Sequence, residues 1–178
     1  GQEMKEHTAG EWLQLANGSV VMALAGKLLP QTGIFFAMGL LYLSVLYGYM
    51  CFPLNSGFFP MFLAMVLLVV AAQGFAVFMT GMSRRNRIAL SACALWGVLS
   101  FSVSGFTFPA TSMPRFIQLV CNLFPVRHYY LLYVDQALNG VPMYFSWQPY
   151  MALVVFAVLP VLVLPKLKSD LRENRYLP

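Results

Sequence analysis

The chain has 178 residues, of which 60% are hydrophobic, 15% aromatic and 10% charged. Globular proteins have about 25% charged residues, so these charges are too few to cover the surface of so much apolar volume. The composition excludes a disordered chain, a coiled coil and a disulfide-rich secreted domain, and it indicates an all-α integral membrane protein. The net charge of +5 then bears on orientation in the bilayer and not on nucleic acid binding.

Residues 1–29 predict a pair of short amphipathic helices that lie along the membrane surface. Charged residues dominate the start, apolar residues follow around Trp12, and Asn17-Gly18 is typical of a turn. Ser19 can cap a second short helix, from Val20 to Leu29. No signal peptide precedes the first apolar run, and the chain starts at Gly1, so we expect a fragment or a processed product of a longer protein.

Four apolar runs without charged residues in their interiors predict transmembrane helices. Pro30 is expected to open the first run. The third run is rich in small residues, which let helices approach one another closely in lipid. A charged segment that is expected to be soluble, residues 165–178, follows the fourth run. The spans are expected at residues 31–51, 58–82, 88–106 and 147–164.

Residues 107–146 differ from the spans because prolines divide them into two short apolar stretches. These stretches, Phe116 to Phe124 and Tyr129 to Leu138, each have about ten residues, too few to cross a hydrocarbon core of about 30 Å. They predict a re-entrant helical hairpin, formed by two half-helices that dip into the membrane or lie on it at its outer side.

Basic residues predict the orientation. With the N-terminal segment on the cytoplasmic side, four spans return the tail and the 84–87 loop to that side. Only Arg115 and Arg127 of the 11 Lys and Arg residues would then lie outside. This asymmetry agrees with the positive-inside rule. The expected cytoplasmic residues are Lys5, Lys27, Arg84, Arg85, Arg87, Lys166, Lys168, Arg172 and Arg175.

Motifs for common catalytic chemistry are absent from the sequence. It contains no P-loop, no His-Glu-x-x-His and no Gly-x-Ser-x-Gly, so we expect no catalytic residues, no metal and no cofactor in this chain. Cys51, Cys93 and Cys121 lack the spacing of metal ligands and are expected to be free thiols packed as small apolar groups. A Cys51–Cys121 bridge at the outer side is the alternative.

Two sets of polar residues are candidates for a functional site. His128 and Asp135 are seven positions apart, which places them on one helix face beside Arg127. They could instead face water or pair to hold the half-helices together. Gln73, Ser100 and Ser104 lie within spans and are expected to line a pathway or to hydrogen-bond between helices. No carboxylate or lysine lies inside a span, which argues against a proton-coupled or sodium-coupled carrier.

Four segments in order carry a resemblance to a known family. They are Glu11-Trp12-Leu13 through Gly26-Lys27-Leu28-Leu29-Pro30, Ser104-Gly105-Phe106-Thr107-Phe108-Pro109 with Met113-Pro114, Leu123-Phe124-Pro125-Val126-Arg127-His128-Tyr129, and the tail Asn174-Arg175-Tyr176-Leu177-Pro178. Over essentially its whole length, the chain resembles the C-terminal membrane part of an ABC transporter permease of the type-2 exporter family. Typical members have six spans, so the first two spans and the extracytoplasmic domain between them would be missing here.

The resemblance implies a multi-pass permease of the bacterial inner membrane that exports drugs, lipids or glycans. Its partners would be a cytoplasmic ABC ATPase, a second permease subunit and, in some exporters, a periplasmic adaptor. The implied ATPase-coupling residues are Glu11, Trp12, Leu13, Leu15 and Ala16. The implied outer gate contains Phe108, Pro109, Pro114, Pro125, Arg127, His128 and Asp135. The alternatives are a membrane enzyme that uses His128 and Asp135 at the outer interface, and a membrane scaffold that transports nothing.

Overall fold

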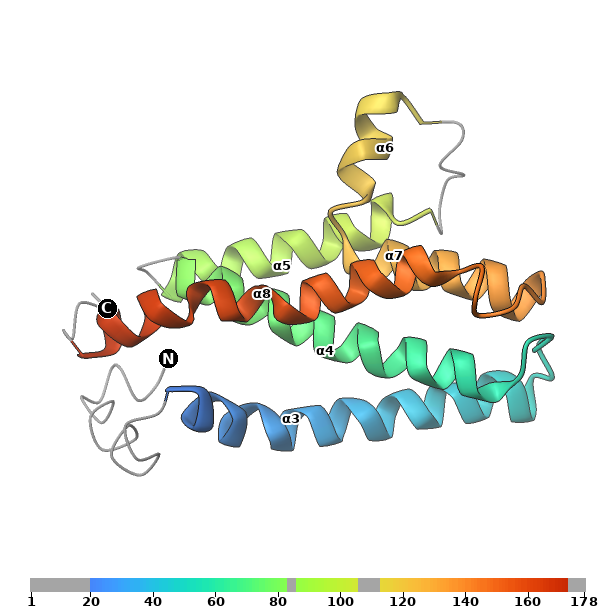
Figure 1. The fold of residues 1–178 in the computed structure, drawn as a ribbon, viewed down its shortest axis with the longest axis horizontal. Helices are drawn as coiled ribbons and strands as arrows, with labels where there is room; N and C mark the ends of the chain where they lie inside the picture. The colour runs from blue at the N-terminus through green and yellow to red at the C-terminus, as the bar shows by residue number, and fades with distance from the viewer. Residues whose placement is uncertain (1–19, 83–85, 106–112, 173–178) are drawn as a thin grey trace.

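The computed structural model describes residues 20–82, 86–105 and 113–172. The expected coupling residues at 11–16, together with Phe108 and Pro109, lie outside the described residues. The described residues form an elongated bundle of helices (Figure 1). The expectation of an all-α protein is confirmed for them.

The first long helix, α3, runs from Val20 to Leu43 and continues as a π-helical segment, η1, from Ser44 to Tyr49. Pro30 lies inside α3, so the expected break between a surface helix and a first span is wrong. A proline removes one backbone hydrogen bond from a helix. Ending a helix leaves several backbone groups unpaired, which is worse in an apolar environment, and the helix therefore continues.

The remaining helices follow in chain order. Helix α4 covers Phe58–Met82, and α5 covers Asn86–Val103. Between α5 and the last helix lie α6 (Arg115–Cys121), α7 (Pro125–Leu132) and the π-helical segment η3 (Tyr133–Leu138). Helix α8 covers Trp147–Arg172. It passes both Pro160 and Pro165, so the expected tail does not begin at residue 165 but continues the last helix.

Among the described residues, two helical segments, Leu24–Tyr49 and Phe58–Met82, are long and apolar enough to cross a membrane. The third and fourth expected spans correspond to shorter apolar helical stretches, Arg87–Val103 and Trp147–Val163. The four-span topology therefore stays a prediction. So does the re-entrant position of α6 and α7, although both helices are as short as expected.

Helix α4 lies at the centre of the bundle, packs most extensively against α8, and also contacts α3, α5 and α7. The start of α3, the end of α4, the start of α5 and the end of α8 share one end of the bundle (Figure 1). The connection at residues 51–57, the end of η3 and the start of α8 share the other. We call the latter the distal end. Helix α6 projects from the side of the bundle (Figure 1).

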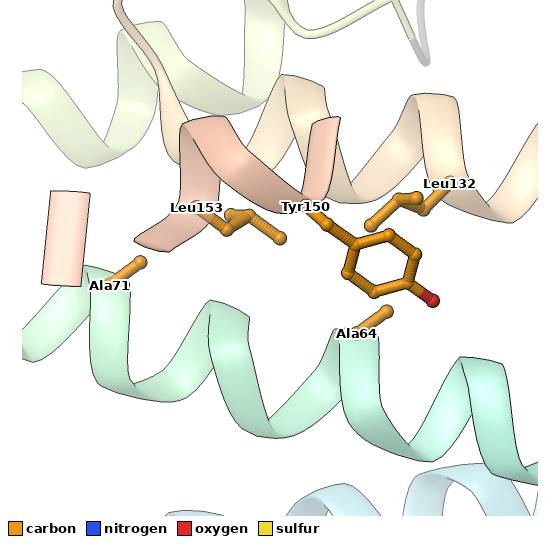
Figure 2. Packing of buried hydrophobic residues seen from close by; sticks show 5 residues of the cluster. All are labelled: Ala64, Ala71, Leu132, Tyr150 and Leu153. Atoms are coloured by element: carbon orange, nitrogen blue, oxygen red, sulfur yellow. The ribbon is translucent and has the colours of Figure 1, made fainter. Parts of the chain in front are cut away.

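Small residues of α4 allow the close contact with α8. Figure 2 shows the Tyr150 ring and the Leu153 side chain of α8 beside Ala64 and Ala71, with Leu132 of α7 completing the cluster. Further along α4, a Cβ atom on Gly74 would lie 2.7 Å from the carbonyl oxygen of Phe156 in α8. The two backbones are therefore as close as glycine permits.

The small residues of α5 play a lesser part than the sequence suggested. Ala89 and Ser100 are buried, as is Ser104 directly after the helix, but most other small residues of α5 are exposed. Large apolar side chains are also exposed all around the bundle, among them Leu41 (67%), Leu95 (64%) and Leu162 (71%). Such an apolar exterior is what a protein needs when lipid and not water surrounds it.

Candidate functional site

Neighbouring residues in the first turn of α7 hold the ends of two other helices. Arg127 Nη1 donates a hydrogen bond of 3.2 Å to the carbonyl oxygen of Ser104, directly after α5. His128 Nε2 lies 3.0 Å from the carbonyl oxygen of Asn122, which ends α6. A carbonyl only accepts, so Nε2 carries the proton and donates it. Both residues thus satisfy backbone groups that a helix C-terminus leaves unpaired.

Burial favours the neutral form of His128, whose side chain is 9% exposed. Burial lowers the pKa of this imidazole below its ordinary value of 6.5. The hydrogen bond to Asn122 opposes the shift, and the positive charge of Arg127 adds to it. His128 is therefore a neutral hydrogen-bond donor at neutral pH.

The prolines of this region start the short helices. Pro114 precedes α6, and Pro125 is the first residue of α7. Pro125 occupies the first position of its helix, which suits proline because its missing N–H would be unpaired there in any case. Pro114 is the N-cap residue of α6, with φ of −55° and ψ of 146°. Both residues thus have structural roles at the junction, and their expected part in an outer gate stays a prediction.

Asp135 lies at the other end of the α7–η3 rod, near the distal end. Its Oδ2 atom accepts a hydrogen bond of 3.4 Å from the Ser146 hydroxyl, and its backbone carbonyl accepts one of 2.9 Å from Val141 N–H. His128 instead packs beside Phe156, with ring centroids 6.1 Å apart. Asp135 and His128 therefore have different partners, and this geometry gives no support to a catalytic pair.

Asn55 ties the connection between η1 and α4 to the end of η3, a contact that sequence reasoning missed. Its Nδ2 donates a hydrogen bond of 2.7 Å to the carbonyl oxygen of Leu138, and its backbone N–H donates one of 3.2 Å to Ala137. Gly140, with φ of +66°, fits against it, since a Cβ there would lie 3.0 Å from Asn55 Cβ. The sequence signal was only an Asn-Ser-Gly turn.

Tyr150 joins three elements in the buried interior, and sequence reasoning missed this contact too. Its hydroxyl lies 3.0 Å from the carbonyl oxygen of Pro60 in α4 and 2.9 Å from Oε1 of Gln136 in η3. A hydroxyl has one proton and cannot donate to both acceptors. Turning the Gln136 amide over lets Nε2, otherwise unpartnered, donate to Tyr150 while Tyr150 donates to Pro60. Gln136 is 0% exposed, so this pairing matters for stability.

Gln73 connects α4 to α3. Its Oε1 atom accepts a hydrogen bond of 2.9 Å from the Thr32 hydroxyl, which also lies 2.8 Å from the carbonyl oxygen of Leu28. This contact is interhelical hydrogen bonding, one of the two roles expected for Gln73. Of the serines, Ser104 is 0% exposed and donates to the carbonyl of Phe101, whereas Ser100 is 4% exposed and has no partner for its hydroxyl.

Cys51, Cys93 and Cys121 are free thiols in this structure. Cys121 is buried and Cys51 is exposed, and the structure has no bridge between them. The Cys121 thiol lies 3.9 Å from the sulfur of Met113. Its environment is that of a small apolar core residue.

Comparison with known proteins gives one finding. Residues 2–164 match the family described as ABC-2 family transporter protein. No curated protein and no solved structure matches the chain. The match covers most of the 178 residues and includes every helix of the bundle up to Leu164 of α8. The chain therefore belongs to the ABC-2 family of transporter proteins.

Proposed function

We propose that this membrane permease works as part of an ATP-driven exporter, with a separate cytoplasmic ABC ATPase that supplies the energy. The observation that carries the proposal is the family match over residues 2–164, on a helical bundle with an apolar exterior. These 178 residues contain no P-loop, and in this proposal ATP hydrolysis takes place on a separate subunit.

In this proposal, α3 transmits motion from the ATPase side. The coupling segment, Glu11 to Ala16, precedes α3 in the chain with three residues between them, and the helix continues through Pro30 to the end of η1. Few residues of Leu24–Tyr49 are buried, against a third of those in α4. A helix with few buried contacts can shift against its neighbours at lower cost than one that is packed on several sides. We therefore assign α3 as the moving element and the α4–α8 pair as the fixed one.

The proposed outer gate is the distal end of the bundle, where η3 meets residues 51–57. Asn55 and Tyr150 hold η3 there through hydrogen bonds to Leu138 and Gln136. Both η1 and η3 are π-helical, a geometry that is frequent at functional sites. Movement of α3 would reach this gate through η1 and the connection that follows it.

A second permease subunit would complete the transport pathway between two copies or two related chains. The exposed apolar faces of α3 and α5 are available for this contact or for lipid. The distribution of basic residues supports a cytoplasmic N-terminal segment and C-terminal tail, in the bacterial inner membrane. A periplasmic adaptor would then meet the distal end.

Co-purification tests the proposal. The full-length permease, extracted gently from membranes, should bring down an ABC ATPase subunit with measurable ATP hydrolysis. Trp12→Asp should release this subunit or uncouple its activity, because a charge replaces an apolar contact, whereas Trp12→Phe should keep both. If no nucleotide-binding partner is recovered with the wild-type protein, the exporter proposal is wrong.

A further inference from the structure

A hydrogen bond between side chains crosses the contact of α3 with α4. Thr32 Oγ1 lies 2.9 Å from Oε1 of Gln73 and 2.8 Å from the carbonyl oxygen of Leu28 in its own helix. The hydroxyl has one proton, which cannot serve both acceptors. Turning the Gln73 amide over lets Nε2 donate to Thr32 while Thr32 donates to Leu28. In either orientation of the amide, one hydrogen bond joins the two helices.

Gln73 depends on Thr32 for this hydrogen bond. Among the described residues, the second polar atom of its amide is buried and has no partner. Gln73 lies nine residues before the end of α4 at Met82, which is about 14 Å along the helix and well inside an apolar segment. A lipid tail cannot replace the Thr32 hydroxyl as a partner. The amide is therefore paired only while the two residues lie opposite each other.

A second close contact belongs to the same alignment of the two helices. A Cβ atom on Gly39 of α3 would collide with the side chain of Met65 in α4. Thr32 and Gly39 are seven residues apart along α3, and Gln73 and Met65 are eight residues apart along α4 in the opposite direction. The hydrogen bond and the close contact thus fit one antiparallel alignment.

The apolar groups at this contact resist sliding only weakly. Phe36 meets Phe62 edge to face with ring centroids 5.6 Å apart, and Met65 is a flexible side chain. Apolar contact has no preferred direction, and lipid tails are as apolar as these side chains, so sliding exchanges one such contact for another. A hydrogen bond depends on distance and angle. It therefore distinguishes one alignment from the next.

The polar groups match at one alignment only. The residues one helical turn before and after Thr32 on α3 are Leu28, Leu29, Phe35 and Phe36. The residues one turn before and after Gln73 on α4 are Val69, Val70, Ala76 and Val77. All eight are apolar. Sliding α3 by one turn in either direction would therefore leave the Gln73 amide without a partner.

We propose that Thr32 and Gln73 are positioning residues that set the axial position of α3 on α4. Fixing the alignment of two helices is the best-attested role of a polar group within an apolar helix contact. If α3 is the moving element of the exporter, the same pair holds the position from which that movement starts. Only this last step rests on the proposed function.

Disulfide cross-linking in membranes measures the alignment directly. In the full-length permease, with the three cysteines of this chain replaced by alanine, the reference pair is Gly39→Cys with Met65→Cys. Met65→Cys also removes the side chain that a Cβ on residue 39 would meet. The offset pairs combine Met65→Cys with Phe35→Cys or with Leu43→Cys. These positions lie one turn, or about 5.4 Å, from Gly39 along α3, which takes them out of reach of a disulfide.

The reference pair should cross-link at least about tenfold faster than either offset pair. Gln73→Leu should lower this preference about three- to tenfold, the factor that one hydrogen bond between helices supplies. Thr32→Val should have the same effect, and combining the two should add nothing further. Thr80→Val is the matched control, because its hydroxyl bonds to the carbonyl oxygens of Ala76 and Val77 within α4.

Gln73→Leu separates alignment from stability. Thr32 keeps its hydrogen bond to Leu28 in this variant, and no buried polar group is left unpaired. The variant should therefore fold, with a melting temperature close to that of the wild type. An unchanged preference for the reference pair in Gln73→Leu would overturn the proposal, and so would an equal loss of preference in Thr80→Val.

ATP separates this proposal from the exporter proposal. In the assembled transporter, ATP hydrolysis should shift cross-linking from the reference pair towards one of the offset pairs. An alignment that depends on Thr32 and Gln73 but does not change with ATP would keep their positioning role and overturn α3 as the moving element. Cross-linking without ATP needs no ATPase partner, so the positioning role is measurable even if the exporter proposal fails.

Discussion

Gly74 of α4 meets the backbone of Phe156 in α8 so closely that a Cβ atom would lie 2.7 Å from the Phe156 carbonyl oxygen. The obstacle is backbone and not a flexible side chain, so the helices would have to move apart to admit even a methyl group. The pair α4–α8 is the most extensive contact in the bundle. Gly74 therefore sets the separation of the two helices on which the other elements pack.

Gly74→Ala is expected to lower the stability of the protein by about 1–3 kcal/mol, because the added methyl group overpacks this contact. The melting temperature in detergent is the measurement. Gly33→Ala in α3 is the matched control, since a Cβ there meets nothing within 4 Å. Alanine is also the better helix former, so the control should be neutral or slightly stabilised. Equal effects of the two substitutions would contradict the close contact.

Tyr150→Phe is expected to cost about 1–3 kcal/mol, because it leaves the buried Gln136 side chain without its hydrogen-bond partner. Unfolding by denaturant or heat measures this loss. Tyr144→Phe is the control, because Tyr144 is 83% exposed. The double variant Tyr150→Phe with Gln136→Leu should recover part of the loss by removing both polar groups. A double variant less stable than Tyr150→Phe alone would argue against the pairing.

Asn55→Cys with Gly140→Cys is expected to form a disulfide under mild oxidation. The two Cβ atoms would start 3.0 Å apart, closer than the separation of about 3.5–4.5 Å in a disulfide, and the φ of +66° at Gly140 disfavours a side chain, so the two segments have to shift slightly apart. Cys51→Ser removes the exposed native thiol nearby, and Gly33→Cys with Gly140→Cys is the control pair. Gel mobility with and without reductant reports the bridge.

The same cysteine pair tests whether the distal end opens. If it is the outer gate, cross-linking should decrease when the assembled transporter hydrolyses ATP, because opening separates Asn55 from η3. Cross-linking that proceeds equally with and without ATP would place the gate elsewhere, while leaving the contact between these residues intact.

Acidification is expected to destabilise the protein through His128. Its pKa is lowered from 6.5 in the folded state, so the unfolded chain binds the proton more tightly. The contribution of His128 is fully present above about pH 6.5 and is lost as the pH falls through the folded-state value. Melting temperatures between about pH 7.5 and about pH 5.5 measure the effect. His128→Gln, which keeps a donor but cannot titrate, should flatten this dependence, whereas His7→Gln should not.

Much of the architecture follows from the sequence alone. Apolar runs without charges predict long helices, because a chain in lipid must satisfy its backbone internally. The prolines at 114 and 125 divide a short apolar region from its neighbours, and the short helices expected there are found, although α7 begins at Pro125 and not at Tyr129. The sequence also showed the family resemblance, through the order of four segments, and the match over residues 2–164 confirms it.

Other features depend on contacts between residues that are far apart in sequence. Pro30 looked like a helix start, yet the helix passes through it. Arg127, His128 and Asp135 looked like one cluster, yet they bind Ser104, Asn122 and Ser146 in turn. Spacing along a helix tells which residues share a face, but not what that face meets.

The sequence by itself determined that this protein is a helical membrane protein, because composition and hydrophobic run length fix how the backbone can be satisfied in lipid. Its membership of a permease family came from the resemblance carried by four segments in order. Only the tertiary structure decided that α4 and not α5 carries the closest packing, and that Asn55 holds the end of η3. Glycine and asparagine occur both at such contacts and at positions without them. The two cases differ in whether a second backbone segment lies against the residue, and here that segment is more than 80 residues away in the chain.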